Sequence, residues 1–183
     1  MNIAYIEEHS YIYGPGCRFV IWVQGCSIHC KGCWNQSMWN FEPNMIIPVE
    51  ELFLRIFREK ESIEGITILG GEPLDQYEDT LHILSMSKNA GLDTMLFTGY
   101  TIPELKDKGM NAIFDVTGIL ITGRYEQDRR TIERQWIGST NQEIHFLSER
   151  WKNFEKIDAN YVEISIDTTG SITILGFPDE EFI

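Results

Sequence analysis

The sequence predicts an α/β fold in which parallel strands alternate with helices and a β-hairpin closes the chain. Short β-branched and aliphatic runs alternate with helical patterns through most of the 183 residues. This order is typical of parallel strands joined by right-handed crossovers. Near the C-terminus, residues 161–167 and 171–177 are two more β-rich runs, separated only by Thr168-Thr169-Gly170. Two such runs so close together predict a hairpin.

Four apolar runs are the predicted parallel strands. They cover residues 19–23, 66–69, 94–97 and 119–121. Each run is followed within two residues by a glycine, namely Gly25, Gly70, Gly99 and Gly123. Parallel sheets bind their ligands at the carboxyl ends of the strands. We therefore expect these glycine-containing loops to face one binding site.

Three segments carry helical patterns. The clearest begins at Pro48, has two acidic residues in its first turn and is expected to stop at Gly65. Its apolar stripe consists of Val49, Leu52, Phe53, Ile56 and Phe57. The other two helices are expected to run from about Tyr77 to Gly91 and from Pro103 to Gly109.

Length and charge exclude several classes of protein. The 183 residues fit a single domain spanning 1–183. With 28 acidic and 15 basic side chains the formal charge is −13, which argues against a nucleic-acid-binding surface. The longest apolar run, residues 19–23, is far shorter than the roughly 20 residues that cross a bilayer. We expect no membrane span and no secretion signal.

Three of the four cysteines lie within eight residues and suggest a metal or redox site in a reducing cytoplasm. Cys26, Cys30 and Cys33 are separated by gaps of three and two residues. Thiolates are the usual protein ligands of iron–sulfur clusters, and a [4Fe-4S] cluster ordinarily takes four. Three would leave one iron open to a small chelating ligand. Cys17 lies outside this spacing and is interpreted as a small core residue.

The same loop has a second interpretation, in which the protein is a non-catalytic zinc-binding module. His29 would then join the three cysteines as the fourth zinc ligand. Zinc ligands normally come as separated pairs, and His29 is adjacent to Cys30, which gives it poor reach to the same ion. The spacing therefore favours the cluster, and zinc stays open as the alternative.

The CxxxCxxC spacing resembles that of the radical S-adenosylmethionine (SAM) superfamily, and more narrowly the anaerobic ribonucleoside-triphosphate reductase activating proteins. The segments that carry the resemblance are Gly14-Pro15-Gly16-Cys17-Arg18, Cys33-Trp34-Asn35 with Trp39, Gly70-Gly71-Glu72-Pro73, Thr98-Gly99-Tyr100-Thr101, Ile121-Thr122-Gly123-Arg124-Tyr125 and Gly138-Ser139-Thr140-Asn141-Gln142. They fall between residues 14 and 142. The first 13 and the last 35 or so residues contribute little to it.

The resemblance implies a fold, cofactors and a reaction. The fold would be an incomplete parallel α/β barrel, open on one side. Cys26, Cys30 and Cys33 would bind three irons of a [4Fe-4S] cluster, and SAM would chelate the fourth. Reductive cleavage of SAM would yield a 5′-deoxyadenosyl radical that takes a hydrogen atom from a glycine of a partner enzyme.

The first choice of partner is the anaerobic ribonucleotide reductase, with a low-potential electron donor such as flavodoxin or ferredoxin. Another glycyl-radical enzyme or a ribosomal peptide is the alternative substrate. Because the radical does the chemistry, we expect no catalytic side chain beyond the cluster and SAM.

By the same resemblance, several residues would contact SAM. The expected contacts are Trp34, Asn35, Gly70, Gly71, Glu72, Thr98, Gly99 and Tyr100. Among them Glu72 would accept a hydrogen bond from the SAM ammonium group. Simpler interpretations stay open for three positions: an ordinary turn for Gly70-Gly71, a packed side chain for Tyr100 and a core aromatic for Trp34.

Overall fold

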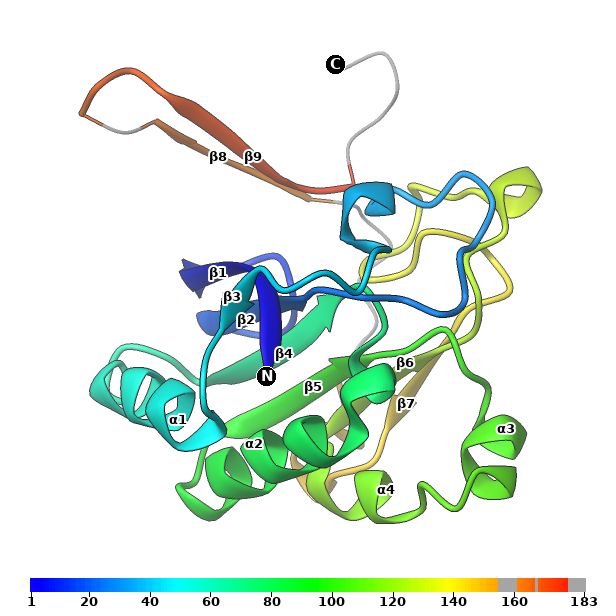
Figure 1. The fold of residues 1–183 in the computed structure, drawn as a ribbon, viewed down its shortest axis with the longest axis horizontal. Coiled ribbons are helices and arrows are strands. Elements are labelled where there is room, and N and C mark those ends of the chain that lie inside the picture. The colour runs from blue at the N-terminus through cyan, green and yellow to red at the C-terminus, as the bar shows by residue number, and fades with distance from the viewer. Residues whose placement is uncertain (155–160, 167, 178–183) are drawn as a thin grey trace.

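A computed structural model describes residues 1–154, 161–166 and 168–177, and its centre is a seven-stranded mixed sheet (Figure 1). The strand order is β3-β1-β2-β4-β5-β6-β7. The bounds are β1 Asn2–Ser10, β2 Arg18–Val23, β3 Met45–Ile46, β4 Gly65–Gly70, β5 Asp93–Phe97, β6 Ile119–Thr122 and β7 Glu143–Phe146. A separate two-stranded sheet consists of β8 Val162–Ile166 and β9 Ile172–Gly176.

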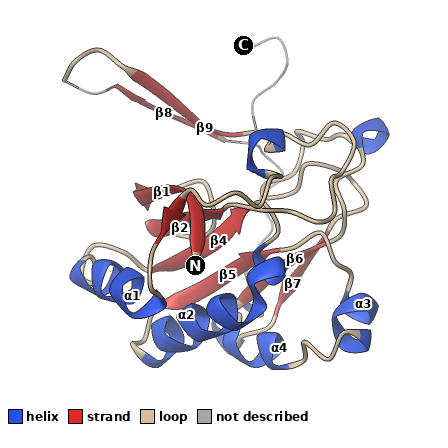
Figure 2. Cartoon of the chain, in the orientation of Figure 1, coloured by secondary structure: helices blue, strands red, loops and turns tan. Residues whose placement is uncertain are grey.

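The helices lie along one face of the large sheet (Figure 2). They are α1 Val49–Arg58, α2 Tyr77–Asn89, α3 Ile102–Asp107 and α4 Ala112–Val116. The loops of the described ranges contain four short 3₁₀ helices: η1 Gln36–Met38, η2 Pro73–Gln76, η3 Gln127–Arg129 and η4 Glu149–Trp151. Leu52 of α1 and Leu84 of α2 are fully buried against strand residues such as Ile21 and Ile68, which forms the main core.

The prediction of parallel strands over the four apolar runs is confirmed, and the structure shows that the four are neighbours in the sheet. Strand β2 pairs with β4, β4 with β5 and β5 with β6, all in parallel. These strands are buried on both faces: Ile21 packs under the helices, whereas its neighbours Val20 and Trp22 belong to a second cluster on the opposite face. Burial on both sides explains the continuous apolar runs in the sequence.

The flanking strands make the sheet mixed and are absent from the predicted set. Strands β1, β3 and β7 each pair antiparallel with a neighbour. In the part of the chain that the structure describes, β3 and β7 are the two edges, so the sheet is open rather than a complete barrel. Strand β1 carries Glu7, Glu8 and His9, which hide its strand character in the sequence.

The first helix ends earlier than predicted. Helix α1 stops at Arg58, and Gly65, the expected stop, is instead the first residue of β4. A Cβ atom at Gly65 would lie 2.3 Å from the carbonyl oxygen of Asp93, so glycine is needed for close strand packing there. Phe57, assigned to the apolar stripe, is 47% exposed.

The C-terminal hairpin is also confirmed, with β8 and β9 antiparallel and in register from Val162↔Gly176 to Ile166↔Ile172. It extends away from the large sheet (Figure 1). Asp167, part of the predicted hairpin, lies outside the described residues. None of the helices in the described ranges has the length and apolar character needed to cross a membrane.

Candidate functional site

The loops that follow the parallel strands meet at one cavity of about 150 Å³, which we call the cysteine cavity. Nine of the eleven residues predicted as ligands or SAM contacts line it: Cys26, Cys30, Cys33, Asn35, Gly70, Gly71, Glu72, Thr98 and Gly99. They come from the last residue of β4 and from the loops after β2, β4 and β5, because the carboxyl ends of parallel strands share one edge of the sheet.

The cysteine loop is fixed by hydrogen bonds at its start. The Cys26 N–H group donates to the carbonyl oxygen of Trp39 (3.1 Å). The next residue, Ser27, donates from its N–H group and its Oγ atom to the Asp75 carboxylate (2.6 and 2.8 Å). A tight turn, in which the Cys33 N–H group donates to the Cys30 carbonyl oxygen (3.0 Å), closes the loop.

The thiols of the three clustered cysteines differ in how deeply they are buried. Cys26 is buried, and Cys30 and Cys33 are half-buried. Burial raises the pKa of the Cys26 and Cys30 thiols, while backbone N–H groups that bond to the sulfurs act in the opposite direction. Those donors are His29 and Ile28 toward Cys26, and Tyr125 toward Cys30. Hydrogen bonds to sulfur are a feature of protein sites that tune iron–sulfur clusters.

The three thiols line one cavity without being drawn to a single point. Across residues 1–154, 161–166 and 168–177, no three side chains of His, Cys, Asp or Glu are placed to hold a metal ion. His29, the alternative zinc ligand, does not line the cavity. Its ring stacks on Trp39, with the centroids 4.7 Å apart and the planes 24° apart. The geometry therefore does not support a fourth ligand from His29.

Glu72 lines the cysteine cavity and is buried, with 2% of its surface exposed. Its Oε1 atom accepts from the Leu74 N–H group (3.0 Å) and from Thr98 Oγ1 (2.8 Å), and its Oε2 atom accepts from the Gly99 N–H group (2.8 Å). Burial raises the pKa of this carboxyl group to about 7, against the effect of these three donors. Glu72 thus joins the loops after β4 and β5.

Gly70 and Gly71 are required by contacts between chain segments. A Cβ atom on Gly71 would lie 2.1 Å from the Gly25 carbonyl oxygen. Gly70 has a φ of 109°, in the region that favours glycine. The pair therefore allows the end of β4 to pack tightly against the start of the cysteine loop, whichever ligand the cavity accepts.

The other predicted contacts lie in three different places. Asn35 lines the cavity and donates from Nδ2 to the Gly70 carbonyl oxygen (3.3 Å). Tyr100 is buried outside the cavity lining, with its hydroxyl 3.4 Å from both Ser27 Oγ and Asp75 Oδ1. Trp34 is 49% exposed and also lies outside the lining.

Gly123, whose loop was expected to face the site, lines the cavity, and seven further wall residues were not predicted: Ile28, Trp39, Leu69, Phe97, Ile121, Tyr125 and Gln142. Leu69, Phe97 and Ile121 are the last residues of predicted strands, so their position at the site could have been inferred. Tyr125 and Gln142 come from the loop between β6 and β7. Both lie in segments that carry the family resemblance, but no predicted strand or helix brings that loop back over the sheet.

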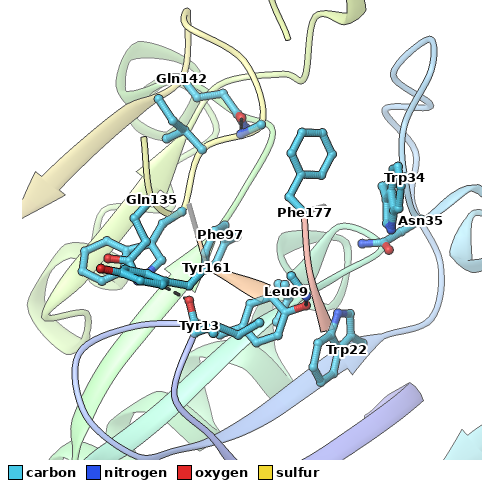
Figure 3. A pocket seen from close by; sticks show the side chains of 15 residues that line it. Tyr13, Trp22, Trp34, Asn35, Leu69, Phe97, Gln135, Gln142, Tyr161 and Phe177 are labelled. Atoms are coloured by element: carbon cyan, nitrogen blue, oxygen red, sulfur yellow. Dashed lines mark hydrogen bonds between the residues drawn. The ribbon is translucent and has the colours of Figure 1, made fainter. Parts of the chain in front are cut away.

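A second cavity of about 190 Å³ adjoins the first, and we call it the aromatic cavity (Figure 3). The two cavities share Asn35, Leu69, Phe97 and Gln142. Aromatic side chains dominate the remaining wall: Tyr13, Trp22, Trp34, Trp136, Tyr161 and Phe177. Trp34, predicted at the cofactor, therefore belongs to this neighbouring cavity.

Comparisons with known proteins agree with this site. Residues 12–145 match the family described as a 4Fe-4S single cluster domain. The anaerobic ribonucleoside-triphosphate reductase-activating protein of Enterobacteria phage T4 is 33% identical over 164 residues, which are 86% of this chain and 97% of that protein. The protein of the same name from Haemophilus influenzae is 31% identical and covers 79% of this chain and 97% of its own.

A likeness among solved structures is weaker. QueE from Escherichia coli aligns with a TM-score of 0.40 and 19% identity, covering 55% of this chain and 52% of that one, which is too little to support an argument. The sequence relatives, in contrast, span almost their full length, and the resemblance seen in the cysteine spacing is confirmed. The chain belongs to the family of anaerobic ribonucleoside-triphosphate reductase-activating proteins.

Proposed function

We propose that this protein activates an anaerobic ribonucleoside-triphosphate reductase by generating a glycyl radical on it with a [4Fe-4S] cluster and SAM. One observation carries the proposal: the three cysteines of the CxxxCxxC spacing line the same cavity as the segments that follow β4 and β5. The names of the relatives, which match over most of the chain, support the choice of reductase as partner.

The donor groups of the cysteine cavity fit these cofactors. Cys26, Cys30 and Cys33 would hold three irons, and SAM would take the fourth. The backbone N–H groups directed at the Cys26 and Cys30 sulfurs suit an anionic cluster. When bound, the cluster and SAM supply a 5′-deoxyadenosyl radical, which takes a hydrogen atom from a glycine of the partner.

Glu72 would bind the ammonium group of SAM. A carboxylate offers about four lone-pair positions, and the three donors to Glu72 are all uncharged. One position is left, and an ammonium group there would form a charge-assisted hydrogen bond in a buried setting. Glu72 is thus a positioning residue for the ligand.

The remaining cavity residues would contact other parts of SAM. Gly70 and Gly71 would lie beside its amino-acid end, and Thr98 and Gly99 beside the nucleoside. Asn35, which donates to the Gly70 carbonyl oxygen, would approach SAM on the same side as the two glycines. Trp34 and Tyr100 have less support as SAM contacts, because neither lines the cysteine cavity.

The aromatic cavity would give the partner's glycine a route to the radical. It shares four wall residues with the cysteine cavity, so a segment with small side chains bound there would lie next to the cofactors. Its apolar wall would exclude water from a reaction that water would otherwise disturb.

Several wider expectations belong to this proposal. The open sheet would correspond to the incomplete barrel of radical SAM enzymes, and residues 1–183 would form one domain. The reaction needs a low-potential electron, for which flavodoxin or ferredoxin is the expected donor. The cytoplasm, with reduced thiols, is the expected location.

The test is anaerobic reconstitution with iron and sulfide, followed by reduction with SAM and the reductase from the same organism. We expect about four irons per chain, release of deoxyadenosine, and an electron paramagnetic resonance signal from a glycine-centred radical. Deoxyadenosine without that signal would contradict the choice of partner and favour another glycyl-radical enzyme or a peptide. A colourless protein that holds one zinc ion would contradict the proposed chemistry altogether.

A further inference from the structure

Hairpin β8–β9 has two unlike faces, because alternate residues of a strand point to opposite sides. One face is attached to the body of the protein at its base. There, Glu163 Oε2 accepts hydrogen bonds from Ser10 Oγ (2.7 Å) and from the Tyr11 N–H group (3.2 Å). Leu175, the register partner of Glu163, packs against the buried cluster that contains Trp22.

The opposite face presents four isoleucines to solvent, and we call it the isoleucine face. Its members are Ile164, Ile166, Ile172 and Ile174, with 51%, 69%, 61% and 44% of their surface exposed. They form two cross-strand pairs, Ile164↔Ile174 and Ile166↔Ile172. Among the described residues of the two strands, only Glu163 is charged, and it is engaged at the base.

Such a surface is unusual for a strand pair that stands apart from the main sheet (Figure 1). An isolated two-stranded hairpin is marginally stable in water, and natural proteins usually protect exposed strands with charges or proline. A contiguous apolar patch on an otherwise acidic protein marks an interaction surface. The isoleucine face therefore has the character of a surface that a partner covers.

The base of the hairpin is part of the aromatic cavity. Tyr161 and Phe177, which flank the two strands, both line that cavity (Figure 3). The Gly176 N–H group donates to the Tyr13 hydroxyl (2.9 Å), and the Phe177 ring meets Trp34 edge-on, with centroids 5.4 Å apart. A partner seated on the hairpin would thus lie beside the cavity that adjoins the cysteines.

The formal charge of the chain and the extent of the family match bear on which partner covers the isoleucine face. Two copies of a chain with a formal charge of −13 repel each other, which disfavours self-association through this face. The family match ends at residue 145, so the hairpin lies outside the part of the chain that carries the cluster-domain pattern. An element added beyond that part suits recognition of one particular partner.

We propose, on the basis of the proposed function, that the isoleucine face is the docking surface for the anaerobic ribonucleoside-triphosphate reductase. The reductase would cover it with an uncharged, apolar surface of its own. Docking there tethers the reductase next to the aromatic cavity, which raises the effective concentration of its glycine segment at the radical site.

The test replaces the outer cross-strand pair, Ile166→Thr together with Ile172→Thr. Threonine is β-branched and keeps the strand preference while it removes apolar surface. The probe is the reductase of the same organism, and its affinity for the reconstituted protein is measured by sedimentation. We expect the Kd to rise at least about tenfold, as loss of two buried apolar side chains predicts. SAM cleavage without the reductase, the far-ultraviolet circular dichroism spectrum and Tm should stay unchanged.

A matched control exchanges the pair on the opposite face, Ser165→Thr with Thr173→Ser. This exchange keeps the composition and the strand preference, so the affinity for the reductase should equal that of the unaltered protein. Equal binding by the isoleucine variant, or equal weakening by the control, would overturn the docking surface. So would a dimer of the protein alone that the isoleucine variant converts to a monomer, because a second copy would then cover the face.

Failure of the proposed function has a different signature. In that case the unaltered protein would show no binding to the reductase at all, whatever the hairpin carries. A protein that binds the reductase with a Kd that the isoleucine variant leaves unchanged keeps the proposed function and loses only the docking surface.

Discussion

Each end of the parallel sheet buries a carboxylate, and the two carboxylates have different partners. At the amino ends of the strands, Asp93 Oδ2 lies 2.9 Å from Arg18 Nη1, and both side chains are almost fully buried. Trp151 Nε1 donates to the other oxygen of Asp93 (2.7 Å). At the carboxyl ends, the donors to Glu72 among the described residues are all uncharged.

The difference separates a structural end of the sheet from a functional one. Arg18 also donates to Thr67 Oγ1 and to the carbonyl oxygens of Pro15 and Ile66, so its charge is balanced and its donors are used. Burial without a cation raises the pKa of Glu72 to about 7. A buried carboxylate without a cationic partner can bind a cationic group of a ligand. A buried carboxylate that is already paired with a cation cannot.

The largest expected effect comes from the thiols of the functional end. Cys26→Ala, Cys30→Ala and Cys33→Ala should each abolish reductive SAM cleavage, because a cluster that loses one of three protein ligands is not held in the required state. Deoxyadenosine release and iron content, measured after anaerobic reconstitution, check this. Full activity in any of the three variants would contradict the ligand assignment.

Cys17→Ala is the matched control for these variants. Cys17 is 6% exposed and belongs to the main core, so its loss should lower the free energy of unfolding by about 1 kcal/mol and leave SAM cleavage intact. Loss of iron in this variant would show that the fourth cysteine is a ligand after all.

The next largest effect is expected at the structural end, from Arg18→Met. The change leaves Asp93 buried without its cation and should lower the free energy of unfolding by about 3–5 kcal/mol. Urea denaturation checks this. The double variant Arg18→Met with Asp93→Asn should recover part of the loss, because no uncompensated charge remains. A double variant as unstable as the sum of two independent losses would mean that the pair is not coupled.

Glu72→Gln should change how the stability of the protein depends on pH. The folded protein binds a proton at Glu72 more tightly than the unfolded chain does, so between pH 4.5 and about 7 the unfolded state binds fewer protons. Stability contributed by protonated Glu72 is therefore complete below pH 4.5 and is lost as the pH rises to about 7, by on the order of 3 kcal/mol.

Glutamine cannot ionise, so this part of the pH dependence should disappear in the variant. The check is the difference in unfolding free energy between the two proteins across this pH range. SAM binding should also weaken in the variant, since a neutral amide gives the ammonium group no charge-assisted bond. Parallel pH curves for both proteins would show that Glu72 has an ordinary pKa.

The sequence was sufficient to predict the parallel strands and insufficient for their neighbours. Residues 19–23 form a continuous apolar run because β2 is buried on both faces, and that is visible without a structure. Strand β7 has an exposed Glu143 and partly exposed neighbours, so it shows no such run. The prediction for Gly65 is wrong because two kinds of glycine look alike in a sequence. One kind ends a helix, and the other leaves room for a backbone carbonyl of the neighbouring strand, here that of Asp93.

The site residues likewise fall into those that the sequence predicts and those that it does not. Cysteines and glycines that follow predicted strands could be brought to one edge by topology alone, and the structure places Cys26, Gly71 and Gly99 at one cavity. Tyr125 and Gln142 reach that cavity only because the loop after β6 folds back, which depends on tertiary contacts. Arg18 and Asp93 are 75 positions apart, and nothing local indicates that they pair.

The smallest effect is expected from Arg124→Ala, at the rim of the functional end. Arg124 meets Glu104 through two contacts of 2.8 and 2.9 Å, the same separation as in the buried Arg18–Asp93 pair. The Arg124 guanidinium and the Thr101 N–H group lower the pKa of Glu104 to about 2, so the contribution of the pair is present above pH 4.5 and is lost as the pH falls toward 2. The two side chains are 44% and 36% exposed, and solvent screens their attraction. Removing Arg124 should therefore lower the free energy of unfolding at pH 7 by about 1 kcal/mol or less, as measured by urea denaturation. A loss as large as that of Arg18→Met would show that burial does not determine how much each of the two ion pairs contributes to stability.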